Sequence, residues 1–293
     1  KGSMSWVTSI SGDDRGIISI SDLPEKSKAL FDDVKTKFVK KEKAFAASFI
    51  QVTFATKATY KARYHAAAIH GGAKAEVSVE LQGISDEVLQ QIADQAAVIY
   101  EEKLLAAGLE VIPYSSLADN KGFAKIVEKS DPRRVETKIP ALMKSSGTTH
   151  TKTFTAHDGP IYDGKAAGQL YKMQSKLKAG TIVSHFTINF STFDKEKEWR
   201  QSYGDIIQTV SVEAIPVISM GNISTWISSK SKFGMLHQLK FWASDKDFLV
   251  SGEEMESGAF GMKVDPEAYK SACLELITKN IEKTVEHIRS LSK

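Results

Sequence analysis

Apolar and polar residues alternate along two stretches in the first third of the chain. Ile50, Val52 and Phe54 are each followed by a polar or small residue, and the stretch from Val77 to Leu81 repeats the pattern. A period of two places successive side chains on opposite faces of a strand. The pattern predicts one strand that runs to about residue 60 and a second that ends at Gly83.

The same alternation covers much of the chain from residue 181 onward. It predicts strands that carry Ile182, Phe186, Ile188 and Phe190, and strands over 205–219, 223–229, 235–243 and 248–250. Met220-Gly221-Asn222 has turn composition, and Pro216 requires an edge, a bulge or a bend because proline cannot donate to a strand ladder. Short turns between successive strands indicate hairpins and therefore antiparallel pairing.

Residues 85–107 have the period of a helix instead. Leu89, Ile92, Ala96, Ile99 and Leu104 share one face. Ser85 is a favourable N-cap, and Gly108 suits the left-handed residue that follows a helix. Residues 109–112 then predict a strand.

A second long helix is expected over residues 265–292. Asp265 is its N-cap and Pro266 occupies the first turn. Apolar residues hold one face for about seven turns, so this helix must lie along a sheet. Cys273 is on that face, where a cysteine acts as a small buried apolar residue.

The remaining segments are less regular. Leu30, Phe31, Val34 and Phe38 occur at helical spacing among lysines and predict an amphipathic helix over 25–43. Residues 114–180 form an irregular insert with short helices near 117–129 and 165–177.

These elements predict an α+β fold: a mostly antiparallel curved sheet packed by two long helices, with an irregular central insert. Residues 1–4 resemble a cloning remnant. The expected organisation is an N-terminal arm with the amphipathic helix over 5–44, followed by a single domain over 45–293 with the insert at 114–180.

Composition narrows the class of protein. Apolar residues make up 42% and charged residues 26% of the 293 residues, as in ordinary globular proteins. The net charge is +3, and only six of the 39 basic residues are arginine, which argues against nucleic-acid binding. A single cysteine excludes an intramolecular disulfide, and no stretch reaches the roughly 20 apolar residues of a transmembrane helix.

Known catalytic and cofactor motifs are absent from the sequence. The chain has no phosphate-binding loop, dinucleotide fingerprint, nucleophile elbow or zinc-binding His-Glu-x-x-His pair. We therefore assign no catalytic residue, no metal ligand and no cofactor. His150, His157 and Asp158 cluster in the insert and are candidate ligand-binding residues; the alternative is a polar surface loop. Trp226 and Trp242 are further candidates because aromatic residues crowd the β-rich half, although such residues also fill cores.

Three segments, Val77–Asp86, Leu89–Asp94 and Leu104–Ile112, give a strand, a helix and a strand. This unit resembles Gram-negative envelope proteins related to the curli-secretion protein CsgG and the amino-terminal domain of TolB, in which a similar Leu-x-x-x-Gly-x-x-Val step leads from helix to strand. Val264–Tyr269, which opens the last helix, also resembles secreted proteobacterial proteins. The resemblance implies a periplasmic or secreted bacterial protein whose signal peptide has been removed, and it transfers no catalytic residue.

Three hypotheses for the function follow. The first is a non-enzymatic envelope or secreted protein that binds a protein, a glycan or a lipid, or takes part in assembly. The second is a hydrolase or metal-dependent enzyme with a site in the 148–162 loop. The third is a secreted effector that acts on a host protein. The sequence leaves the ligand and the oligomeric state open.

Overall fold

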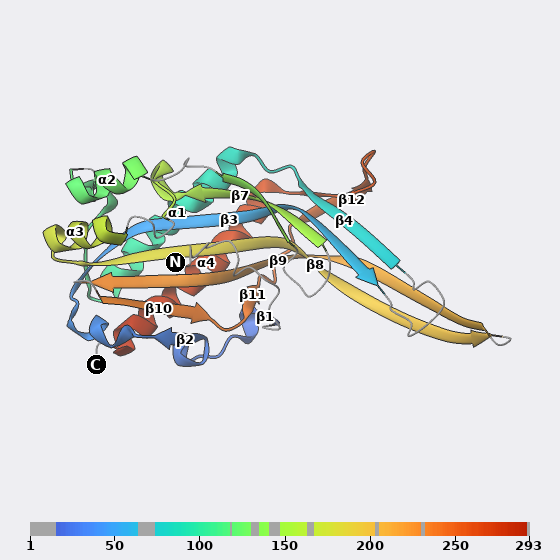
Figure 1. Ribbon diagram of the computed structural model, residues 1–293, viewed down its shortest axis with the longest axis horizontal. Coiled ribbons are helices and arrows are strands. Elements are labelled where there is room, and N and C mark those ends of the chain that lie inside the picture. The colour runs from blue at the N-terminus through green and yellow to red at the C-terminus, as the bar shows by residue number, and fades with distance from the viewer. Residues whose placement is uncertain are drawn as a thin grey trace.

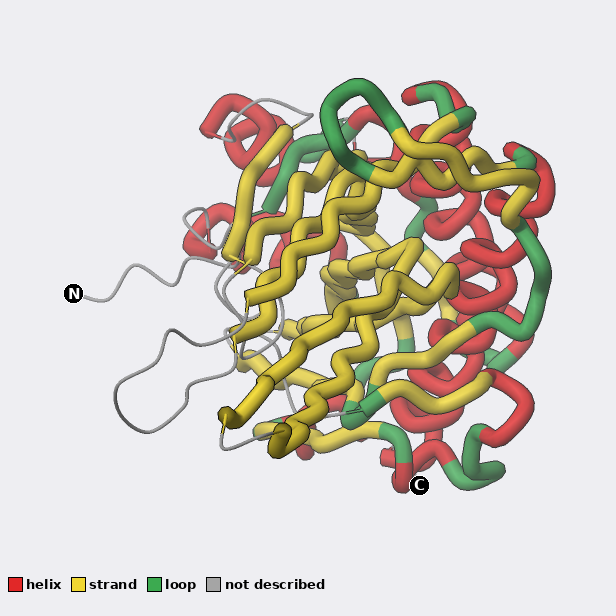
Figure 2. Tube along the Cα trace, turned by 90° about the vertical axis from the view of Figure 1, so that its right-hand side faces the viewer, coloured by secondary structure: helices red, strands yellow, loops and turns green. Residues whose placement is uncertain are grey.

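The structure is a computed structural model. It describes residues 16–63, 74–117, 119–129, 135–140, 147–162, 167–202, 205–229 and 232–291. Its main feature is a large mixed sheet that curls strongly into a half-barrel, with helices α1 (Asp86–Ala106) and α4 (Pro266–Leu291) packed together on one face (Figures 1 and 2). The predicted α+β class is confirmed.

In the described part of the chain the sheet has thirteen strands. They are β1 (Ile17–Ser19), β2 (Phe31–Val34), β3 (Ala44–Arg63), β4 (Lys74–Gln82), β5 (Glu110–Val111), β6 (Val135–Pro140), β7 (Gly147–Thr155), β8 (Gly180–Ser202), β9 (Asp205–Ser229), β10 (Lys232–Gln238), β11 (Phe241–Ala243), β12 (Leu249–Glu254) and β13 (Phe260–Val264). Most neighbouring strands are antiparallel, whereas β3–β8, β3–β5, β4–β13 and β1–β11 are parallel.

Strand β3 organises the sheet. Over Gln51–Phe54 it pairs with β8 and β7 at once, so these two strands lie on its opposite edges. From Lys57 onward β4 pairs with β3, along the edge of β3 that no longer pairs with β8. Beyond this point β8 continues with β9 as its partner.

Two hydrophobic cores form on opposite faces of this sheet. Alternate residues of β3, such as Val52 and Phe54, join β8, α1 and α4 in the main core. Phe49 points to the other face and packs with residues of α2 (Lys121–Lys129) and α3 (Ala167–Leu177) in a second, smaller core. Period-two alternation therefore buries both faces of the sheet at this end.

The two long helices match the sequence prediction. The Asp265 carboxylate accepts from the Ala268 N–H at 2.7 Å, which caps α4. Gly108 follows α1 with a φ of 77°, and β5 comes next, parallel to β3. An ion pair of 2.7 Å between Lys103 and Glu282 joins the two helices. No helix in the described ranges is long and apolar enough to cross a membrane.

The amphipathic helix predicted for 25–43 is wrong. This segment forms two short 3-10 helices, η3 (Ser27–Ala29) and η4 (Thr36–Lys41), on either side of strand β2. Phe31 is buried in the main core, and β2 pairs with β10 through Phe31–Gln238 to Val34–Met235. The edge of β10 supplies a hydrogen-bond ladder that local periodicity cannot reveal, and tertiary pairing overrides helix propensity.

The turn predicted at 220–222 is also wrong, because β9 runs through it to Ser229. A side chain at Gly221 would lie 2.5 Å from Phe241 Cε1, so glycine permits close packing here rather than a turn. The expectation for Pro216 is confirmed: it pairs with Ser191 next to a register shift. The insert at 114–180 contains the two expected short helices, α2 and α3, and two further strands, β6 and β7.

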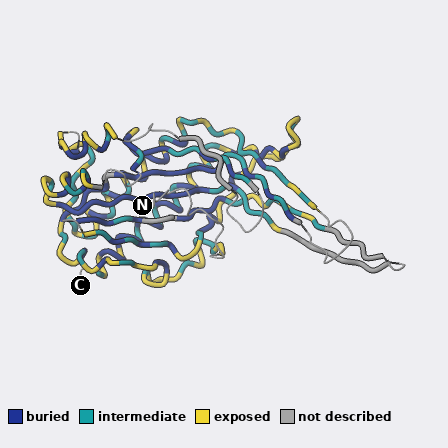
Figure 3. Tube along the Cα trace, viewed as in Figure 1, coloured by how far each residue is buried: buried dark blue, intermediate teal, exposed yellow. Residues whose placement is uncertain are grey.

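The β8–β9 hairpin extends beyond the rest of the sheet as an arm (Figure 1). Buried residues fill the body, whereas the described side chains at the base of the arm are half-buried or exposed (Figure 3). We use "arm" for Ser191–Ser202 of β8 with Asp205–Pro216 of β9, which pair with one another throughout.

Candidate functional site

His157 and Asp158 lie together in a single exposed turn, η6 (Ala156–Asp158). Both have left-handed backbones, with φ of 57° and 49°. The His157 N–H donates to Asp94 Oδ1 of α1 at 2.7 Å, and its ring lies against Tyr114 with centroids 4.5 Å apart. Packing of this turn on α1 accounts for the backbone conformation.

His150 is separate from this pair. It lies in the middle of β7, is half-buried, and pairs with Lys57 of β3 and Lys138 of β6. Five residues of extended chain, about 17 Å, separate it from Thr155 at the end of the strand. The three candidate residues therefore do not form one site, and no group of three or more metal-binding side chains occurs in the described ranges.

The two tryptophans lie on opposite faces of the sheet. Trp242 is fully buried in the main core, near Phe31. Trp226 is half-buried beside the second core and contacts Phe233 edge-on, with centroids 4.2 Å apart. They do not line a common cleft. Trp242 is a core residue, which corrects its selection as a ligand contact.

Two histidines have structural roles. His287 of α4 is buried, and its Nε2 lies 3.1 Å from Asp33 Oδ2 of β2. His185 of β8 is buried on the sheet face opposite α1 and α4, and its Nε2 lies 2.7 Å from Thr53 Oγ1. Burial lowers the pKa of His185 to about 4, so the imidazole is neutral at neutral pH.

The polar layer around His185 contains atoms with no protein partner. Thr53 Oγ1 also bonds Thr153 Oγ1 at 2.8 Å. Among the described residues His185 Nδ1, Thr187 Oγ1 and Gln51 Oε1 are buried and lack a hydrogen bond. A histidine next to a hydroxyl is the arrangement that activates a nucleophile. Here both side chains are buried within the sheet layer, which favours a structural role.

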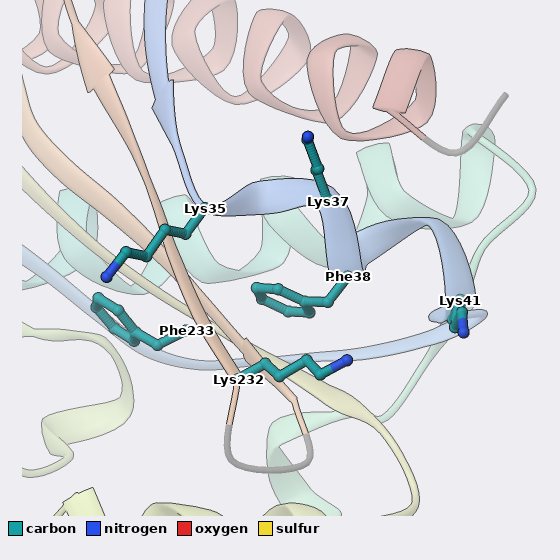
Figure 4. Close-up of a pocket in the computed structure, with 6 residues that line it drawn as sticks. All are labelled: Lys35, Lys37, Phe38, Lys41, Lys232 and Phe233. Carbon is teal, nitrogen blue, oxygen red and sulfur yellow. The ribbon is translucent and has the colours of Figure 1, made fainter.

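A pocket of about 430 Å³ with charged walls lies beside the start of β10 (Figure 4). It is lined by Lys35, Lys37, Phe38, Lys41, Lys232 and Phe233. We call it the lysine pocket. Its residues come from η4, from Lys35 directly before it, and from β10, which is about two hundred residues away in the chain.

Local backbone geometry builds this pocket. The β2–β10 pairing ends at Val34–Met235, and Lys35 then turns the chain away with a left-handed φ of 57°. A Cβ at Gly234 would lie 3.0 Å from the Lys35 carbonyl oxygen, so glycine lets the two backbones approach. Phe38 and Phe233 lie between the lysine side chains (Figure 4).

Two acidic residues that flank the pocket lysines in sequence have partners outside the pocket. Asp33 lies against His287, and Glu42 accepts from the Ser229 hydroxyl at 2.5 Å. Among the residues that the structure describes, no carboxylate lines the pocket. Within the described part of the chain none of its four lysines has an ion pair.

Sequence reasoning missed this pocket. An amphipathic helix over 25–43 would place these lysines on its polar face, and nothing local in the sequence connects them with Phe233. The only local sign of the pocket in the sequence is a lysine-rich stretch that contains Phe38.

Comparison of the chain with family models, with curated proteins and with solved structures found no match. The resemblance to CsgG and to the amino-terminal domain of TolB stays a prediction.

Proposed function

We propose that this protein is a non-enzymatic binding and assembly protein of the bacterial periplasm or exterior, and that the arm is its assembly element. The compartment rests on the resemblance of the strand–helix–strand unit. The assembly role rests on the geometry of the arm.

The observation that carries the proposal is a long ribbon of only two strands. The arm pairs residue by residue from Ser191–Pro216 to Ser202–Asp205 and spans about 40 Å at ~3.4 Å per residue. Among the described residues the arm has no third strand on either edge. An isolated two-stranded ribbon is marginally stable in water, so additional contacts are needed to hold it.

The base of the arm supplies one such contact. Phe193 stacks on Tyr60 of β3 with ring centroids 5.3 Å apart. Farther out, both edges of the ribbon present backbone N–H and C=O groups that another strand can pair with. Pairing of one chain's edge with that of a second chain satisfies these groups and stabilises the ribbon.

The separation of His150 from His157 and Asp158 supports a binding role over hydrolysis at the 148–162 loop. A catalytic site there needs its groups within hydrogen-bond reach of one substrate, whereas about 17 Å of strand lies between them.

The test is the oligomeric state of a shortened arm. Joining Asp194 to Glu213, which face each other, through Asn-Gly removes the distal ribbon and leaves a two-residue hairpin turn. Light scattering coupled to size exclusion should find an assembly for the full chain and a monomer for the variant.

A graded control joins Glu198 to Thr209, another facing pair, and keeps part of the ribbon. It should assemble more weakly than the full chain. Thermal unfolding must show that the body of each variant is folded. A full chain that is monomeric at every concentration, or a shortened variant that assembles equally well, would refute the arm's role.

A further inference from the structure

We propose that the lysine pocket binds a phosphate-bearing ligand whose apolar part packs on Phe38 and Phe233. This inference is independent of the arm and concerns a different surface of the molecule.

Charge selects the class of ligand. Four lysines line the pocket, and no carboxylate is among the described residues that line it. Like charges gathered around one pocket repel one another, and a bound anion converts this repulsion into attraction. Lysine binds phosphate as a compact point charge. A phosphate group carries a charge of about −1.5 to −2 at neutral pH, so it compensates more of the lysine charge than a single carboxylate does.

The orientation of nearby acids distinguishes this pocket from an ordinary solvated lysine face. Solvated faces commonly intersperse charges of both signs. Here Asp33 and Glu42 flank the lysines in sequence, yet each is engaged by a partner in the body, His287 and Ser229 respectively. These two carboxylates are therefore held away from the lysines of the pocket.

The backbone around the pocket is held from both sides. Lys35 has a left-handed conformation that costs a non-glycine residue free energy, and such positions gather at binding sites. Gly234 fixes the opposite wall by close approach to the Lys35 carbonyl. Phe233 is braced by Trp226. A site held in this way needs little rearrangement to bind.

The two phenylalanine rings indicate that the ligand is more than inorganic phosphate. Both are half-buried and lie between the lysine side chains (Figure 4). A volume of about 430 Å³ lies in the range of sites for small organic molecules. A phosphate ester with an aromatic or acyl group uses both the cationic wall and the apolar floor, whether it is a soluble ester or the headgroup region of an anionic phospholipid.

The test compares three probes by calorimetry and co-sedimentation. They are inorganic phosphate, phenyl phosphate, and phosphatidylcholine vesicles with or without phosphatidylglycerol. The pocket variant is Lys37→Glu/Lys232→Glu. The matched control is Lys125→Glu/Lys263→Glu, which makes the same change in net charge at exposed lysines of α2 and β13 outside the pocket.

We expect saturable binding of phenyl phosphate that is tighter than that of inorganic phosphate. The pocket variant should weaken it at least about tenfold, which corresponds to about 1.4 kcal/mol, and the control should bind like the original chain. With Phe233→Ser, phenyl phosphate should bind no more tightly than inorganic phosphate. Each variant must keep the melting temperature and the oligomeric state of the original chain.

Vesicle binding identifies the source of the phosphate. If the original chain and the control variant bind phosphatidylglycerol vesicles and the pocket variant does not, the ligand is a lipid headgroup. If the chain binds phenyl phosphate but no vesicles, the ligand is a soluble ester. Absence of saturable binding to all probes would overturn the proposal. An equal loss in the pocket variant and the control would overturn it too, because the attraction would then be non-specific.

Discussion

Protonation of His185 should destabilise the folded protein as the pH falls from 7 to 5. His185 is 8% exposed, and burial lowers the pKa of its imidazole from 6.5 to about 4. Its Nε2 is bonded to the Thr53 hydroxyl, and its Nδ1 has no partner among the described residues. A charged imidazole would be desolvated in this layer without an anion to compensate it.

The sign and size of this change in stability follow from proton linkage. Because the pKa is lower in the folded than in the unfolded state, the unfolded chain binds more protons between about pH 6.5 and 4. The associated stability is complete above the unfolded pKa and is lost progressively as the pH falls toward the folded pKa. The whole difference between the folded and unfolded pKa values corresponds to about 3 kcal/mol of folding stability, of which about 2 kcal/mol is lost between pH 7 and pH 5.

The assay is urea unfolding, followed by circular dichroism, at both pH values. His185→Gln keeps a group that can bond Thr53 but cannot titrate. Carboxylates titrate in both proteins, so the difference in their pH dependence isolates His185. Between the two pH values, the free energy of unfolding of the variant should fall by about 2 kcal/mol less than that of the original chain. Equal losses in the two proteins would show that His185 is not held neutral by burial, and the reasoning would fail.

Two further predictions concern α4. Asp265→Ala removes the acceptor of the Ala268 N–H and should lower the free energy of unfolding by about 1 kcal/mol in urea titrations. The control Asp247→Ala, at an exposed loop position, should change the free energy of unfolding much less. Equal effects of the two substitutions would contradict the capping role. Cys273 is fully buried, and burial raises the pKa of its thiol, so a thiol-specific reagent should react only after unfolding. Rapid reaction of the native protein would contradict this assignment.

Elements whose signals are local were predictable from the sequence. The cap at Asp265, the proline after it and the apolar face of the last helix are all read within a few residues, and α4 begins where they indicate. Gly108 likewise marks the end of α1 with a left-handed backbone. Period-two alternation located β3 and β4, because one face of each strand packs in a core.

Candidate site residues were less predictable, because closeness in sequence did not mean closeness in space. His150 and His157 are seven residues apart, yet an extended strand carries them far from one another. Trp226 and Trp242 belong to strands of the same sheet but to opposite faces. A strand separates nearby residues at ~3.4 Å per position and alternates their faces, so a cluster in the sequence gives no cluster in the fold.

Hydrophobic periodicity and capping act over a few residues, so the α+β class, the two long helices and most strand positions are predictable from the amino-acid sequence. Residues 31–34, in contrast, form a strand because the distant β10 provides their hydrogen-bond partner. Strand β9 continues through Gly221 because Phe241, also distant in sequence from the predicted turn, fills the space that a side chain would occupy. The lysine pocket has the same origin: pairing of β2 with β10 brings Lys35 and Phe38 to Lys232 and Phe233.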